Sequence, residues 1–133
     1  MIPTATILYA GLLGLIAFAL AVNVSRTRAN VGIVMGDGGN AKLLQAIRAH
    51  ASLSEYVPLC LLMLGLIEMA HGPRWLLHGL GLALVLARLL HAQGLLSSDP
   101  GNALGRKSGA GLQYLVLLVA AAACTYYGVI WRL

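Results

Sequence analysis

The chain has little charge of either sign. Only 10% of its 133 residues are Asp, Glu, Lys or Arg, whereas 59% are hydrophobic. A soluble domain of ordinary composition carries about 25% charged residues. The mean hydropathy of +0.84 points the same way. The composition therefore argues against an ordinary soluble domain and predicts an integral membrane protein, with a length that allows one domain.

The sequence also lacks a concentrated basic stripe. Its net charge of +5 comes from nine basic residues that are spread among apolar segments. Nucleic-acid binding requires such residues to gather on one face. We therefore expect no nucleic-acid partner, and we interpret the charge as a sign of membrane topology and of an anionic ligand.

Cysteine is scarce and metal-binding motifs are missing. Cys60 and Cys124 lie inside apolar runs without CxxC spacing, which favours buried free thiols over a disulfide or metal pair. There is no HExxH, no Walker glycine loop and no Cys/His cluster, so we expect no metal site. The glycine-rich stretch at 36–39 has no strand before it and predicts a turn rather than a dinucleotide fingerprint.

No basic segment precedes the first apolar run, which favours a retained transmembrane helix over a cleaved signal peptide. Each of four apolar segments approaches the ~20 residues that a helix needs to cross the hydrocarbon core. We expect an all-α integral membrane domain, a bundle of four transmembrane helices. The expected spans are about 2–24, 41–70, 75–96 and 110–131.

Polar stretches separate these spans. Residues 25–42 predict a glycine-rich loop in which Asn40 caps the next helix, and residues 97–109 predict a second polar loop. Residues 71–74 predict a tight turn. A helix over 41–70 would be ~45 Å long, so its first turns would extend beyond the ~30 Å hydrocarbon core.

The lysines and arginines are distributed unequally. One side of the predicted bundle has only Arg74 and Arg132, and by the positive-inside rule it faces outward, with both termini. The opposite, cytoplasmic side carries Arg26, Arg28, Lys42, Arg48, Arg106 and Lys107.

Helix two has a polar stripe where it enters the membrane. At ~100° per residue, Arg48, Ser52 and Glu55 share one face, with Tyr56 beside them. Arginine matches a carboxylate and glutamate accepts from an ammonium, so the stripe suits a zwitterionic ligand near the cytoplasmic face. The alternative is an intramolecular Arg48–Glu55 bridge that only eases helix entry into the bilayer.

Other polar residues leave alternatives open. His50 points to the other side of helix two and is either solvated or part of a second site in an oligomer. Arg88 and His91 share a face of helix three. Arg88 either reaches the headgroups or pairs with a carboxylate, for which Glu55 lies at a similar depth. Glu68 is expected at the outer interface.

Arg106 and Lys107 stand just before the fourth predicted span. The first turn of a helix has free N–H groups and a positive dipole end, so an arginine there suits an anion such as a thiolate or phosphate. Positive-inside anchoring is the alternative reading of this pair.

"RAHASLSEYVPL", residues 48–59, resembles the signature of the MAPEG family, the membrane-associated proteins in eicosanoid and glutathione metabolism. Arg48, Glu55, Tyr56 and Pro58 match that signature in register. "ARLLHAQG" resembles the family's third-helix segment, and "GRKSG" resembles the arginine-bearing start of its fourth helix. The likeness covers nearly the whole chain and suggests the small bacterial branch.

The resemblance implies a homotrimer in the bacterial inner membrane, with glutathione as co-substrate bound between subunits near the cytoplasmic face. One subunit would supply Arg48, Ser52, Glu55 and Tyr56. Its neighbour would supply His50 and either Arg26 or Arg28. His91 matches a glutathione-contacting tyrosine of relatives, and Arg106 matches the arginine that stabilises the glutathione thiolate.

The sequence departs from the family pattern at three places. Ser52 replaces the signature asparagine, Leu95 replaces a tyrosine, and the loop before Arg106 is longer than in the synthases. The departures bear on glutathione affinity and on the register of Arg106.

The sequence is compatible with three functions. The first is a glutathione transferase or peroxidase that acts on a lipophilic electrophile or peroxide from the bilayer. The second is a non-enzymatic membrane trimer that binds lipid or a partner protein and uses the polar stripe as a structural ion-pair network. The third, a proton-coupled exporter, would depend on Glu55.

Overall fold

The computed structural model describes residues 2–97 and 103–130. These residues form four helices: α1 (Thr4–Val31), α2 (Ala41–Met69), α3 (Arg74–Leu96) and α4 (Ala103–Ile130). All four are long and apolar enough to cross a membrane. The chain is thus an all-α, four-helix membrane bundle, as predicted.

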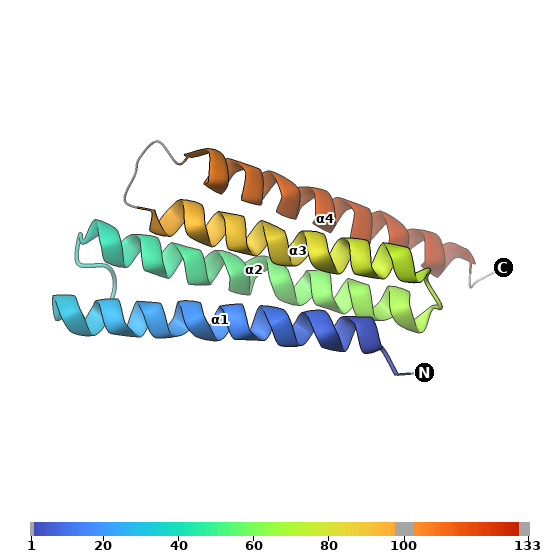
Figure 1. Ribbon diagram of the computed structural model, residues 1–133, viewed down its shortest axis with the longest axis horizontal. Coiled ribbons are helices and arrows are strands. Elements are labelled where there is room, and N and C mark those ends of the chain that lie inside the picture. The colour runs from blue at the N-terminus through green and yellow to red at the C-terminus, as the bar shows by residue number, and fades with distance from the viewer. Residues whose placement is uncertain (1, 98–102, 131–133) are drawn as a thin grey trace.

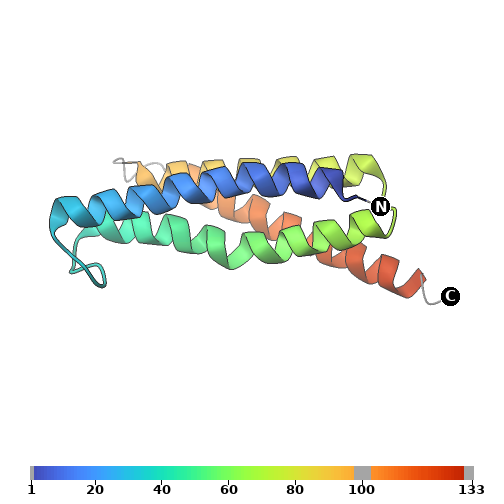
Figure 2. The same ribbon diagram turned by 90° about the horizontal axis from the view of Figure 1, so that it is seen from below.

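Consecutive helices run in opposite directions and lie side by side, as Figure 1 shows. Helix α3 also packs on α1, and α4 packs on α2 and most extensively on α3. Among the described residues, α1 and α4 do not touch. Figure 2 shows α4 crossing the other helices at an angle. The chain enters and leaves the bundle at the same end, where α1 begins and α4 ends.

The interior is apolar and the outer surface is apolar too. Leu13, Ile67 and Leu84 are almost fully buried between the helices. Large side chains such as Phe18 of α1 and Leu118 of α4 are more than two-thirds exposed. In water such a surface would drive aggregation, whereas in lipid it matches the hydrocarbon chains.

The connection between α1 and α2 is shorter than predicted. Residues 25–31 belong to α1, which continues seven residues past the predicted end of its span at Val24. The apolar run marks only the part of the helix that crosses hydrocarbon, while backbone hydrogen bonding continues into the polar region. The turn at 36–39 is confirmed, because Gly36, Gly38 and Gly39 all have positive φ.

Asn40 caps α2 as predicted. Its side-chain oxygen accepts a hydrogen bond of 3.0 Å from the backbone N–H of Leu43, which satisfies one of the free donors of the first turn. At 29 residues, α2 is ~43 Å long. Its first turns therefore extend past the hydrocarbon core.

The tight turn between α2 and α3 is also confirmed, and Glu68 beside it is buried against the start of α1. Glu68 is only 7% exposed. Its carboxylate accepts from the backbone N–H groups of Ala5 and Thr6 at 2.9 and 2.8 Å, and from the Thr6 hydroxyl at 2.7 Å. The sequence did not predict this contact, because only the sequence neighbours of Glu68 were considered. The free N–H groups at the start of α1 attract the carboxylate inward.

Helix α4 begins seven residues earlier than the predicted span. It starts at Ala103, so Arg106 and Lys107 lie inside the helix rather than just before it. Residues 98–102 of the predicted loop lie outside the described residues. The polar composition of 103–109 suggested a loop, but helix packing on α3 stabilises this segment.

Candidate functional site

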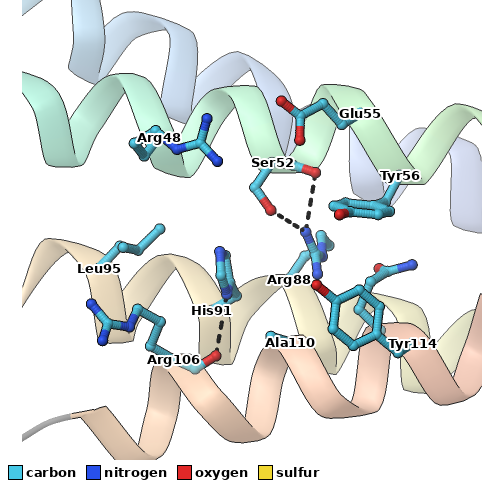
Figure 3. Close-up of a pocket in the computed structure, with 11 residues that line it drawn as sticks. Arg48, Ser52, Glu55, Tyr56, Arg88, His91, Leu95, Arg106, Ala110 and Tyr114 are labelled. Atoms are coloured by element: carbon cyan, nitrogen blue, oxygen red, sulfur yellow. Dashed lines mark hydrogen bonds between the residues drawn. The ribbon is translucent and has the colours of Figure 1, made fainter.

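A cavity of about 360 Å³ opens between α2, α3 and α4 at the end of the bundle that carries most of the cations. Figure 3 shows its lining side chains, which come from all three helices. The lining combines charged, aromatic and small residues: Arg48, Ser52, Glu55, Tyr56, Arg88, His91, Leu95, Arg106, Ala110, Gln113 and Tyr114. Six of the nine residues predicted for a ligand site therefore line one cavity.

The cavity has an exposed mouth and a buried inner end. Arg48, Glu55 and Arg106 are exposed to solvent at the mouth. Arg88 and Gln113 are 3% and 1% exposed at the inner end. A polar ligand held at the mouth would therefore approach a buried, polar interior.

The charges of the lining are unequal. Three arginines face one glutamate, which leaves a formal charge of +2 when His91 is neutral. The low dielectric of the surrounding helices and lipid strengthens the attraction of this charge for an anion. The cavity is thus suited to a ligand with net negative charge and one positive group.

Arg88 connects α3 to α2 at the inner end. Its Nη1 group donates to the backbone carbonyl of Ser52 at 3.3 Å and to the Ser52 hydroxyl at 3.1 Å (Figure 3). The predicted pairing of Arg88 with Glu55 is wrong. Antiparallel packing places both residues at a similar depth, but Glu55 lies at the exposed mouth while Arg88 points into the buried interior.

Helices α3 and α4 approach each other closely beside the cavity. A Cβ atom added at Gly109 would lie 2.6 Å from the backbone nitrogen of His91 and 2.8 Å from the backbone oxygen of Ala87. This closeness lets Nδ1 of His91 donate to the carbonyl of Arg106 at 3.3 Å. The bond links His91 to the backbone of the helix that carries Arg106.

Sequence reasoning missed two lining residues of α4, Gln113 and Tyr114. The ring of Tyr114 makes an edge-on contact with the ring of Tyr56, with 6.0 Å between centroids. Gln113 donates through Nε2 to the sulfur of Cys60 at 3.3 Å. The one available signal was spacing, since Gln113 and Tyr114 follow Arg106 by about two turns and share its helix face.

Arg26, Arg28 and His50 do not line this cavity. Arg26 is exposed on α1 and His50 is half-buried on α2. Arg28 bends toward the loop after its own helix, where Nη1 donates to the carbonyl of Gly36 at 2.7 Å and more weakly to those of Ile33 and Val34. The resemblance assigns these three residues to the site of a neighbouring copy.

Both cysteines are free thiols, as predicted. Cys60 is buried, while Cys124 is half-buried and donates to the carbonyl of Met63 at 3.4 Å. The parts of the chain that the structure describes contain no cluster of three or more His, Cys, Asp or Glu side chains able to hold a metal ion.

Comparison with known proteins gives a consistent result. A family model described as the MAPEG family matches residues 6–126. The chain is 34% identical over 87 residues to "Inner membrane protein YecN" of Escherichia coli K12, which covers 65% of this chain and 66% of that relative. The YecN protein of Escherichia coli O6:H1 matches equally well. The chain thus spans slightly under two thirds of these relatives, and no solved structure matches.

Proposed function

Because the chain belongs to the MAPEG family, we propose that it is a glutathione-dependent membrane enzyme, a transferase or peroxidase for lipophilic electrophiles or peroxides. The family includes enzymes of both kinds. The observation that carries the proposal is the charge pattern of the cavity, three arginines and one glutamate around the same space.

Glutathione matches the signs of the charges at the mouth of the cavity. Its thiolate form has two carboxylates, one thiolate and one ammonium, which give a net charge of −2. Arg48 and Arg106 suit two of the anionic groups, and the single glutamate can accept from the ammonium. Charge-assisted hydrogen bonds of this kind are stronger than neutral ones and specify orientation.

Each predicted residue has a role in the proposal. Arg48 binds one carboxylate, Glu55 binds the α-amino group, and Ser52 and Tyr56 add neutral hydrogen bonds. His91 contacts the peptide from α3. Arg106 stabilises the thiolate, since a nearby cation favours the charged form of a thiol.

The remaining roles require more than one copy of the chain. In the proposed homotrimer, the second carboxylate binds Arg26 or Arg28 of a neighbouring copy, and His50 of that copy contributes from the other face of α2. This arrangement explains why one membrane helix carries polar residues on two of its faces. Glutathione is then shared between subunits at the cytoplasmic face of the inner membrane, the membrane named in the description of YecN.

The lipophilic substrate reaches the cavity from the bilayer. Tyr114 lines the cavity and is 57% exposed, and Leu115 and Leu118 continue along the outer surface of α4. An apolar tail can lie along this surface while the reactive group enters the cavity. Membrane lipids surround the same face.

A thermal unfolding experiment tests the proposal. Reduced glutathione should raise the unfolding temperature of the detergent-solubilised protein, since a ligand that binds only the folded state stabilises it by about 2.7 kcal/mol at 100 times its Kd. Cysteinylglycine, which lacks the γ-glutamyl group recognised by Arg48 and Glu55, should not. An equal rise with both compounds, or none at millimolar glutathione, contradicts the proposal.

The non-enzymatic alternative depends on a structural ion-pair network in the polar stripe. The bonds drawn in Figure 3 join Arg88 to Ser52 and His91 to Arg106, and none of them joins an arginine to Glu55. Charged groups that do not neutralise one another remain available for a ligand, which favours a binding site over a structural ion-pair network.

A further inference from the structure

Among the residues that the structure describes, no carboxylate forms an ion pair with Arg88. The side chain is only 3% exposed, and its two hydrogen bonds both involve Nη1 and Ser52. Its Nε is buried and, within the described residues, has no acceptor. Burying a cation without a counter-ion costs free energy. A site that keeps one is therefore suited to receive negative charge during its function.

The neighbours of Arg88 at the inner end are neutral. Tyr56, Tyr114 and Cys60 lie close enough to interact with its charge, and Gln113 bonds to Cys60. The Oε1 atom of Gln113 is also buried without a donor among the described residues. The inner end therefore holds a preorganised positive charge with unused hydrogen-bonding capacity, as enzymes arrange where charge develops during a reaction.

We propose that Arg88 is a catalytic residue that stabilises the negative charge formed on an oxygen atom of the lipophilic substrate. The proposal rests on the proposed glutathione-dependent function. It assigns the thiolate to Arg106 near the mouth and the substrate oxygen to Arg88 at the inner end. The preferred substrates are then lipophilic molecules whose attacked bond leaves its electron pair on oxygen, namely organic hydroperoxides and epoxides.

The position of Arg88 fits this role better than binding of the peptide. The groups suited to the charged ends of glutathione, Arg48 and Glu55, lie at the exposed mouth. Arg88 shares the inner end with Tyr114, whose ring reaches the lipid-facing side of α4. A substrate arriving along α4 would present its polar head to Arg88 while its tail stays in lipid.

The reaction with a hydroperoxide illustrates the role. The glutathione sulfur attacks the terminal oxygen of ROOH, an S–O bond forms, and the O–O bond breaks with its electron pair on the alkoxide RO⁻. Arg88 stabilises this alkoxide until it takes a proton from water to give ROH. The sulfenic acid GSOH then reacts with a second glutathione to give GSSG and water, so the peroxide is reduced and two thiols are oxidised.

The test compares two substrates in the purified protein with saturating glutathione. Cumene hydroperoxide releases an alkoxide, a strong base that needs stabilisation, whereas 4-nitrobenzyl chloride releases chloride, which needs little. Arg88→Gln should lower kcat for the hydroperoxide about 100-fold or more, the loss typical of one oxyanion-stabilising donor. It should lower kcat for the chloride less than about tenfold. Arg88→Lys keeps a positive charge and should restore part of the difference.

Two further variants make the test decisive. Gln113→Glu places a carboxylate near Arg88 with little change of shape, so it should reproduce the selective loss even if Arg88→Gln does not fold. Arg74→Gln removes an exposed arginine at the other end of α3 and should leave both rates unchanged.

The outcomes separate the two proposals. Equal loss of both rates in Arg88→Gln and in Gln113→Glu would show that Arg88 only ties α3 to α2, and would overturn its catalytic role alone. Absence of glutathione-dependent turnover in the unsubstituted protein would overturn the proposed function, and the role of Arg88 with it.

Discussion

Glu68 connects the end of α2 to the start of α1. Its carboxylate accepts three hydrogen bonds from the first turn of α1. Glu68→Ala should lower the free energy of unfolding by about 2 kcal/mol, because it removes a charged cap and leaves buried N–H groups unsatisfied. Glu68→Gln, which keeps one acceptor oxygen, should lose less.

Denaturant titration in micelles checks this effect. Met69→Ala is the matched control, since Met69 is the adjacent residue and is 61% exposed. A Glu68→Ala variant as stable as Met69→Ala would show that the cap contributes nothing to stability.

Arg106 should affect the chemistry more than the binding of glutathione. If its guanidinium stabilises the thiolate, Arg106→Ala should lower kcat by about 100-fold while the glutathione-induced rise in unfolding temperature changes little. Lys107→Ala, at the neighbouring exposed position, is the control. Equal losses of binding and turnover in Arg106→Ala would assign this arginine to a carboxylate instead.

The sequence predicted some site residues because they share one helix face. Arg48, Ser52, Glu55 and Tyr56 are spaced so that any straight helix brings them together, and all four line the cavity. The partner of Arg88 could not be predicted in this way. Depth in the membrane follows from topology, whereas the direction of a side chain around the helix depends on how two helices are rotated against each other.

Among the elements, the α3–α4 pair depends on glycine for its close approach. Gly109→Ala would place a methyl group against the backbone of His91 and Ala87. We expect the helices to separate, the unfolding temperature to fall, and the bond between His91 and Arg106 to break, with loss of glutathione binding. Small residues allow this kind of packing between membrane helices.

Gly111→Ala provides the comparison on the same helix. A Cβ atom there would meet nothing within 4 Å, so alanine should stabilise α4 by up to about 1 kcal/mol through its higher helix propensity. Thermal unfolding of both variants, with and without glutathione, distinguishes them. Similar behaviour of the two variants would contradict the role given to Gly109.

The ends of the helices were less predictable than their number. Apolar runs indicate where a chain crosses hydrocarbon, so they predicted four spans, and a capping residue such as Asn40 marks a start that sequence can reveal. The last turns of α1 are polar, and the first turns of α4 are polar and contain glycine. These turns are helical in the folded bundle, which local composition does not encode.

At the scale of the whole molecule, each glutathione site is expected to require residues from two neighbouring copies of a homotrimer. Mass measurement of the detergent-solubilised protein by light scattering should give a trimer after subtraction of the micelle. Arg48→Gln and the double variant Arg26→Gln/Arg28→Gln should each abolish glutathione binding alone. Co-assembled mixtures of the two should recover part of it, because a site with Arg48 from one variant and the loop-one arginines from the other becomes possible. A monomeric protein that binds glutathione would contradict this arrangement.

Topology provides a second test at this scale. The beginning of α1 and the end of α4 lie at one end of the bundle (Figure 1), opposite the cation-rich cavity. The positive-inside rule predicts that this end faces outward. Alkaline phosphatase fused after the last residue should be active and a fluorescent protein there dark, with the reverse for insertions at Gly39. The opposite pattern would place the cavity outside the cell.

Arg28 connects the loop after α1 to the proposed ligand site. Its guanidinium stabilises the segment 33–36 by donating to three carbonyls. If Arg28 instead binds a glutathione carboxylate in the site of a neighbouring copy, it no longer holds these carbonyls and the segment becomes less ordered. Glutathione binding and order in the loop are then thermodynamically linked. Amide hydrogen exchange at 33–39 would then increase when glutathione binds, and the loop would report the state of a site on another subunit.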